Sequence, residues 1–256
     1  MNDAISHIWT ITKRELGGYF MSPVAYVFIV IFLLLNGFFT FMLGHMIEAG
    51  EASLMRFFMW HPWIYMVFAP AVAMRLWSEE RRLGTMELLL TMPITPWQAI
   101  VGKFLASWIF LFISLTLSFP VMLTVCYLGS PDVGTMFAGY FGSLLMAGGF
   151  LAVTSATSAV TRSQVVSLII SVVACFFLIL IGWEPVTHFL LPWLASWMRE
   201  DWANLITNFV AGFSVMPAFM DFQRGLVTSD NVIFFLSLIA FPLFLTGVFI
   251  RNLRAG

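Results

Sequence analysis

The chain carries very little charge: only 10% of its 256 residues are Asp, Glu, Lys or Arg, while 61% are hydrophobic. Soluble globular domains are about 45–50% apolar and about 25% charged, so this composition excludes an ordinary soluble domain. Apolar runs long enough to cross a hydrocarbon core of about 30 Å occur six times. They lie at about 23–46, 58–77, 97–128, 136–160, 165–183 and 231–250. The sequence therefore predicts an all-α polytopic membrane protein with six transmembrane helices.

A phosphate-binding loop is also lacking. Such a loop needs the pattern G-x-x-x-x-G-K-[ST]. The nearest match is Gly102-Lys103, but Phe104 follows it and Trp97 stands at the first glycine position. If ATP drives this protein, another polypeptide has to bind it.

Cysteines and histidines are few and do not form a metal-binding pattern. Cys126 and Cys175 both fall in predicted spans, where buried thiols behave as small apolar residues more often than as ligands. No two histidines have the i, i+4 spacing of a metal site; the four are His7, His45, His61 and His188. Hydroxyl groups in spans usually bond back to their own helix. We therefore expect no catalytic site, metal or cofactor in this chain, and predict that it is not an enzyme.

Asp, Glu, Lys and Arg are missing from the apolar cores of the six spans. Ion-coupled carriers usually need such groups, so their absence weighs against that class of transporter. Arg75 and Lys103 lie near the ends of their spans, where we expect the side chains to snorkel to lipid headgroups. Asn36 is the strongly polar side chain near mid-span. We expect it to make a hydrogen bond between helices, and contact with a substrate is the alternative.

Positive charge is distributed unevenly between the two sides of the predicted membrane domain. With the N-terminus inside, nine cationic side chains face the cytoplasm: Lys13, Arg14, Arg75, Arg81, Arg82, Lys103, Arg162, Arg251 and Arg254. Three face out: Arg56, Arg199 and Arg224. Because Lys and Arg concentrate in cytoplasmic loops, both termini are predicted to be cytoplasmic.

Two further segments have membrane-surface patterns. The first is residues 3–18, where Ile5, Ile8, Trp9 and Leu16 recur at helical spacing and Asp3, Lys13, Arg14 and Glu15 fall on other faces. This pattern predicts an amphipathic helix in the membrane interface. The second, residues 184–230, is too broken to span and too apolar for an ordinary loop. We predict two short re-entrant helices there, dipping into the outer leaflet.

Small residues recur every four positions in the fourth predicted span, at Gly148, Ala152 and Ala156. This spacing lets helices approach closely in lipid. Packing within one chain is the favoured interpretation, and a seam between two chains is the alternative.

A polar segment at residues 79–95 separates the second and third predicted spans. Gly84 is predicted to interrupt the helix that arrives over residues 59–83. Thr85 can then N-cap a short helix that Pro93 would end. Next, Thr95-Pro96-Trp97-Gln98 has the pattern of a capping box with proline at the first helical position. The sequence therefore predicts a two-turn helix with defined ends at about residues 85–92.

The residues from Glu79 to Thr95, followed by Ile100-Val101-Gly102-Lys103, resemble the cytoplasmic segment of type-2 ABC exporter permeases. That segment has the form E-x-x-x-G-T-x-E-x-L-L-x-x-P-[VI]-[ST] and ends in G-K. The resemblance is to the branch with gliding-motility-type and nitrous-oxide-reductase-maturation-type permeases. Residues 222–227 with Asp230 resemble the region before the last span of that family. The likeness covers essentially the whole chain, as a single permease domain of residues 1–256.

The resemblance implies that the helix at 85–92 is a coupling helix inserted into a cleft on a separate ATPase. The implied coupling residues are Glu79, Glu80, Arg81, Arg82, Gly84, Thr85, Glu87, Leu88, Leu89, Leu90 and Pro93. Implied partners are two ABC ATPase subunits that bind ATP and Mg, a second permease chain and the bilayer of a bacterial inner membrane. A homodimer, a heterodimer and a periplasmic or membrane accessory subunit are all left open, and no nucleic acid is expected.

The leading hypothesis is thus the permease subunit of an ATP-driven exporter. One alternative is a membrane scaffold or force-transmitting subunit driven by an ABC ATPase without solute transport. Another, less favoured, is an intramembrane enzyme. For residues 79–95 themselves, the alternative to docking is a solvated loop whose arginines fix the topology. The sequence does not indicate a substrate.

Overall fold

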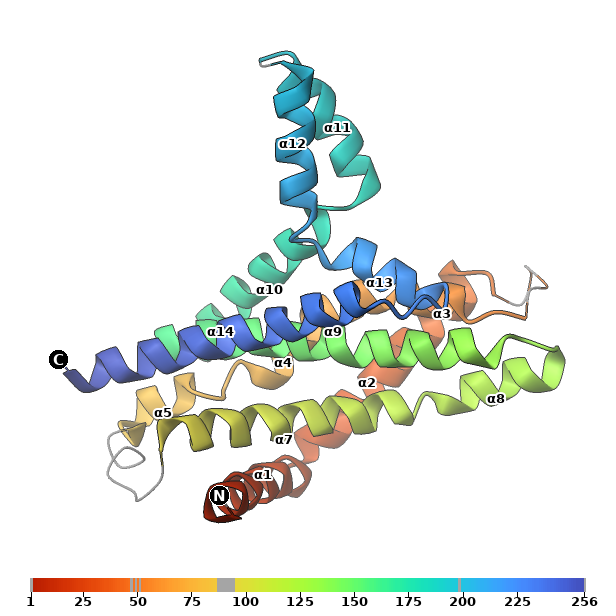
Figure 1. Ribbon diagram of the computed structural model, residues 1–256. Helices are drawn as coiled ribbons and strands as arrows, with labels where there is room; N and C mark the ends of the chain where they lie inside the picture. The colour runs from red at the N-terminus through yellow and green to blue at the C-terminus, as the bar shows by residue number, and fades with distance from the viewer. Residues whose placement is uncertain are drawn as a thin grey trace.

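The computed structural model of the chain describes residues 2–46, 48, 50, 52–86, 95–197 and 199–255. All regular secondary structure in these residues is helical, which confirms the predicted all-α class. The helices pack side by side in one elongated bundle, and the hairpin of α11 and α12 stands out from it (Figure 1). The C-terminus, α5 and α1 lie toward the same end of the bundle, and α3 and the end of α8 toward the other (Figure 1).

The helices follow one another along the chain with short connections. They are α1 (Asn2–Met21), α2 (Pro23–Phe38), the π-helix η1 (Phe39–Leu43), α3 (Met55–Phe58), α4 (His61–Ala73), α5 (Ser78–Leu83), α7 (Pro96–Thr116), α8 (Phe119–Leu128), α9 (Val133–Val160), α10 (Gln164–Leu180), α11 (Glu184–Ala195), α12 (Glu200–Ala211), α13 (Val215–Gln223) and α14 (Ser229–Ala255).

Four helical segments of the described chain are long and apolar enough to cross a membrane. They are Pro23–Leu43, Pro96–Leu128, Val133–Val160 and Ser229–Arg251. A fifth results if α10 and residues 185–193, which meet at 70°, are taken as one bent span. The second predicted span, at 58–77, is divided between α3, the 13-residue α4 and a turn. The count of six crossings stays a prediction.

The centre of the bundle is α9, which packs against α4, α7, α10, α13 and α14. Gly148 lies where α7 and α14 approach α9: a Cβ there would be 2.9 Å from Ile239 Cδ1 and 3.0 Å from Trp108 Nε1. Ala152 and Ala156, which follow on the same helix, are also buried. These small residues are therefore covered by helices of their own chain.

The N-terminal helix α1 packs along α7. Ile5 and Trp9 are exposed, whereas Ile11 is buried against Gly102, where a Cβ would lie 2.8 Å from Ile11 Cγ2. Thr12 Oγ1 donates to the Gly102 carbonyl at 3.2 Å. The helix thus exists where residues 3–18 predict it, and its apolar outer face supports the predicted place in the membrane interface.

Two predictions about the spans and their outer connections need correction. Asn36 Nδ2 donates to the Phe32 carbonyl of its own helix at 2.8 Å, so the expected bond between helices is wrong. The broken segment at 184–230 contains a third helix besides the predicted pair. This helix, α13, buries Phe219 and Phe222 completely and packs against α9, so part of the segment belongs to the core.

Candidate functional site

The polar segment begins at a break in the helix after α4. Trp77 N and Ser78 N each donate to Ser158 Oγ of α9 at 3.1 Å, and Ser158 Oγ donates to the Met74 carbonyl at 2.9 Å. In a continuous helix those N–H groups would instead bond to carbonyls four residues earlier. The prediction of one helix over 59–83 is therefore wrong, and α5 is a separate helix attached to α9.

Two more contacts attach α5 to the C-terminal end of α9. Trp77 Nε1 donates to Ser155 Oγ at 3.0 Å. Arg81 Nη1 donates to the carbonyl of Ala159 at 2.8 Å and also to that of Val160. The last carbonyls of a helix have no partner within it and carry partial negative charge. Burial, and then the positive charge of Arg162, lower the pKa of Arg81 below its ordinary value.

Replacing Ser158 by alanine is expected to lower the free energy of unfolding by about 2–4 kcal/mol, because an unpaired buried polar group costs about 1–3 kcal/mol. Two buried backbone N–H groups, those of Trp77 and Ser78, would lose their acceptor. Thermal unfolding in detergent, followed by tryptophan fluorescence, measures the change. Ser155→Ala is the matched control on the same helix. It removes only hydrogen bonds to other side chains, so it should lower the free energy of unfolding by less. Equal stability of the wild type and Ser158→Ala would contradict the role of this serine.

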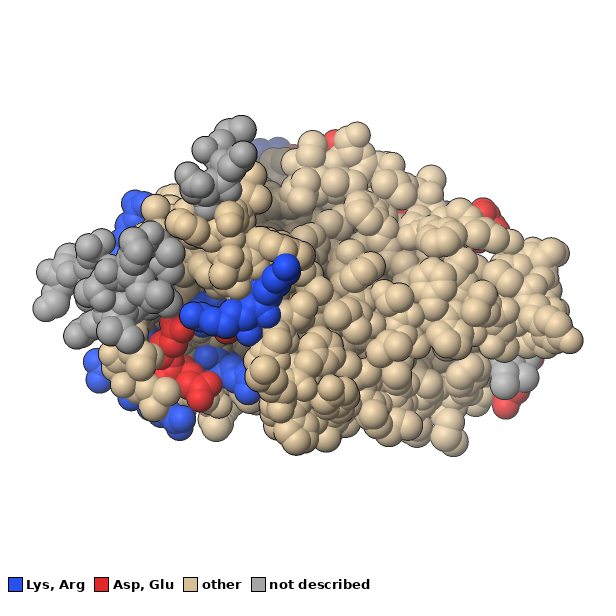
Figure 2. Space-filling model, turned by 90° about the horizontal axis from the view of Figure 1, so that it is seen from below, with Lys and Arg blue, Asp and Glu red and all other residues tan. Residues whose placement is uncertain are grey.

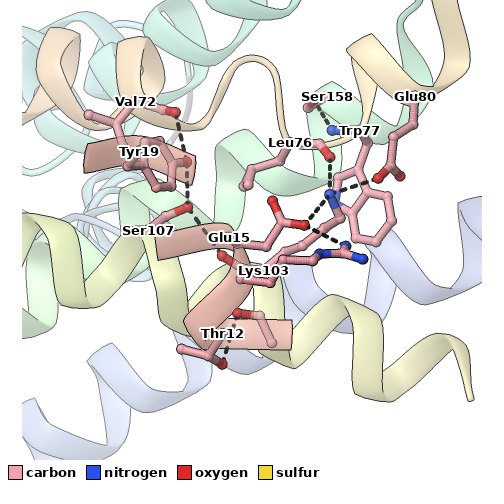
Figure 3. Close-up of polar contacts among 12 residues, drawn as sticks. Thr12, Glu15, Tyr19, Val72, Leu76, Trp77, Glu80, Lys103, Ser107 and Ser158 are labelled. Carbon is pink, nitrogen blue, oxygen red and sulfur yellow. Dashed lines mark hydrogen bonds and ion pairs between the residues drawn. The ribbon is translucent and has the colours of Figure 1, made fainter. Parts of the chain in front are cut away.

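A second set of contacts joins α5 to α7 and α1 through three charged residues, Glu15, Glu80 and Lys103, which we call the charged cluster (Figure 3). Lys103 is 4% exposed. Its Nζ lies 2.8 Å from Glu80 Oε1 and 3.6 Å from Glu15 Oε1, and donates to the Leu76 carbonyl at 3.3 Å. The expectation that Lys103 snorkels to lipid headgroups is therefore wrong.

The charged cluster also fixes the face that α1 turns toward the bundle. Burial alone would raise the pKa of the Glu15 carboxyl, but the charge of Lys103, with the hydrogen bond and charge of Arg14, holds it below its ordinary value of 4.5. The stabilisation from this carboxylate is accordingly present above about pH 4.5 and lost as the pH falls below it. Glu15, which the sequence pattern places away from the apolar stripe of this helix, lies beside the buried Lys103.

The end of α5 matches the prediction at Gly84. This residue has φ +69°, in the left-handed region that glycine enters without strain. Its N–H and that of Thr85 both donate to the Glu80 carbonyl. The helix predicted at 85–92, with Glu87, Leu88, Leu89, Leu90 and Pro93, lies largely outside the described residues. After it, the predicted capping box is confirmed: Thr95 N donates to Gln98 Oε1, and Gln98 N donates to Thr95 Oγ1.

The described coupling residues therefore fall into two groups. Glu80 and Arg81 are bound within the chain, as given above. Glu79 is partly exposed, and Arg82, Gly84 and Thr85 are exposed. Charged side chains gather at this end of the molecule, whereas a broad face beside it carries none (Figure 2). Sequence reasoning missed Ser158 and Glu15, and it did not pair Lys103 with Glu80. Ser158, Glu15 and Lys103 are all distant in the chain from Glu80.

A buried histidine–serine pair lies at the opposite end of α4. His61 Nδ1 is 2.7 Å from Ser143 Oγ, and both side chains are 0% exposed. The rings of Phe57, Phe58 and Tyr65 contact the imidazole. A substrate could not touch either group in this arrangement, so the pair is a packing hydrogen bond and does not favour an intramembrane hydrolase.

These features define a class: a multi-pass membrane protein with a short polar helix attached to one end of its bundle. Comparison with protein families gives the family. The model for "ABC-2 family transporter protein" matches residues 46–255, which is most of the chain. The chain therefore belongs to this family of membrane permease components of ABC transporters, which carry no ATPase site of their own. A comparison with curated proteins found no match.

Proposed function

We propose that the chain is the permease subunit of an ATP-driven exporter. Its residues 79–95 would receive force from an ABC ATPase that binds ATP and Mg. The observation that carries this is the attachment of α5, which Ser158 and Arg81 hold on α9 and Lys103 holds on α7. A short exposed helix can pass force to the membrane-spanning helices only if it is firmly attached to them.

The contacts of α5 suggest how force would travel. A load applied beyond Gly84 would reach α5, whose next contacts are the C-terminal end of α9 and the N-terminal half of α7. Since α9 also packs against α4, α7, α10, α13 and α14, a small displacement of its end would shift several of the helices around it. Close-packed protein interiors have low compressibility and transmit strain.

The end of the bundle that carries α5 is proposed to be cytoplasmic, in a bacterial inner membrane. Both termini lie toward this end (Figure 1), and most of the cationic side chains belong to loops that the charge rule places inside. Pairing with a second permease chain and with two ATPase subunits belongs to the same proposal. The mass of the purified complex would distinguish a homodimer from a heterodimer.

A transport assay tests the proposal even though the substrate is unidentified. The tagged chain is purified with its ABC ATPase, which mass spectrometry identifies by its phosphate-binding loop. Inside-out vesicles that contain the complex are given ATP and membrane extract, and their lumen is analysed by mass spectrometry. An exporter accumulates at least one compound in an ATP-dependent way. An ATPase with its phosphate-loop lysine replaced by alanine is the control and should accumulate none.

The scaffold alternative makes the opposite prediction in this assay. It requires ATP hydrolysis by the complex with no compound moved into the lumen. Hydrolysis that continues at the full rate without any accumulation would therefore overturn the exporter proposal and leave the force-transmitting function.

A further inference from the structure

A cavity of about 230 Å³ lies beside the charged cluster, where α1, α2, α4, α7 and α10 meet. Its walls are mainly apolar, with Val24, Ala25 and Phe28 from α2 and Phe110 from α7. Two polar side chains also line it: Arg75 follows α4, and Gln164 begins α10. The cavity thus combines an apolar lining with a cation and an amide, which is the combination that an anionic amphiphile would need.

Among the described residues that line this cavity, Arg75 alone is cationic. Its guanidinium lies 5.1 Å from the centre of the Tyr19 ring, which also lines the cavity. No ion pair among the described residues involves Arg75, and the nearby Glu15 carboxylate is taken by Lys103 and Arg14. The positive charge at this site is therefore not neutralised by the described part of the chain.

Two helix ends add to the positive potential. Val24 and Ala25 belong to the first turn of α2, and Gln164 is the first residue of α10. A helix N-terminus carries partial positive charge and favours anions. The side-chain amide of Gln164 has no hydrogen-bond partner within the described residues, so it is free to donate to an anion.

Exposed apolar side chains adjoin the cavity. Val24 lines it and is 48% exposed, and Met21 and Val165, close in the chain to lining residues, are 88% and 64% exposed. An acyl chain could therefore lie along this apolar surface while its headgroup reaches Arg75. Basic pockets between membrane helices at the cytoplasmic side are suited to acidic lipid headgroups.

We propose that this cavity binds an acidic phospholipid of the inner leaflet, with the phosphate at Arg75 and Gln164 and the start of an acyl chain beside Phe28. The bound lipid would join α1, α2, α4 and α10 where they meet. It would therefore stabilise the arrangement of α1 on the bundle by binding the folded state. This inference is independent of the exporter proposal and needs only that the bundle lies in a membrane.

The test uses the delipidated full-length chain in detergent. Thermal unfolding and native mass spectrometry are recorded with phosphatidylglycerol, with phosphatidylcholine and with inorganic phosphate. We expect phosphatidylglycerol to raise Tm and to stay bound, and the other two to do neither. Equal stabilisation by phosphatidylcholine would overturn the proposal in favour of plain apolar contact, and stabilisation by inorganic phosphate would overturn it in favour of a soluble anion.

Variants locate the site. Arg75→Gln should weaken phosphatidylglycerol binding about fivefold, as expected for one cationic side chain near an acidic lipid. Arg75→Lys keeps the charge and should keep the preference. The control is Lys13→Gln. Lys13 is an exposed cation on α1 that does not line the cavity, so this variant should bind phosphatidylglycerol as tightly as the wild type does. Equal weakening by Arg75→Gln and Lys13→Gln would overturn the site, as would no weakening at all. The lipid comparison on the wild type stands even if a variant fails to fold.

Discussion

Replacing Lys103 by methionine is expected to destabilise the chain by about 3–5 kcal/mol, the cost of removing one partner from a buried ion pair. The change would leave the Glu80 and Glu15 carboxylates close together without the ammonium that lies 2.8 Å and 3.6 Å from them. Glu80 Oε2 is buried and has no hydrogen-bond partner among the described residues, so Glu80 depends on Lys103. Thermal unfolding of the purified chain measures the loss.

A double-mutant cycle separates this pairing from the lost packing of the lysine stem. Glu80→Gln in the Lys103→Met background removes the unpaired carboxylate, so the double variant should be more stable than Lys103→Met alone. If the double variant instead loses the sum of the unfolding free energies lost by Glu80→Gln and Lys103→Met separately, the two residues are not coupled in solution.

Replacing Glu87 and the three leucines at 88–90 by alanine is expected to abolish co-purification with the ABC ATPase. A few buried residues at the centre of an interface can each contribute about 2 kcal/mol or more, so removing four adjacent contact side chains together should lower the bound ATPase by well over tenfold. The amount of ATPase recovered with the tagged chain is the measurement. An undiminished complex would contradict docking on this segment.

The control for this change is a pair of exposed residues at the opposite end of the bundle. Tyr127 and Leu128, at the end of α8, are 90% and 74% exposed, and Tyr127→Ala with Leu128→Ala should leave the complex intact. The quadruple variant should also unfold at the wild-type temperature, because it keeps Ser158 and Lys103. Loss of the complex would then report on contact and not on folding.

Features coded over a few neighbouring residues could be predicted from the sequence. The long apolar runs are sufficient to locate α2, α7, α9, α10 and α14, because a helix in lipid satisfies its own backbone. Gly84 and the capping box at Thr95 depend on chemistry within four residues, and both occur as predicted. The two-turn helix between them remains a prediction.

Features that depend on distant partners could not be predicted in this way. The break after α4 exists because Ser158, 80 residues further along the chain, accepts the Ser78 N–H. Lys103 at the edge of a span has the pattern of a snorkelling residue, and only the approach of α1 and α5 brings two carboxylates to it. A single sequence gives the charge of such residues, but it does not show which distant residues lie beside them in the folded chain.

Docking of an ATPase at the end of the bundle that carries α5 is tested most directly by photocrosslinking in membranes. Benzoylphenylalanine is placed at Leu83, which is 63% exposed on α5, or at Tyr127 at the opposite end (Figure 1). Irradiation should join the ATPase to the chain at Leu83 and not at Tyr127. An adduct at Tyr127 with none at Leu83 would contradict docking at this end.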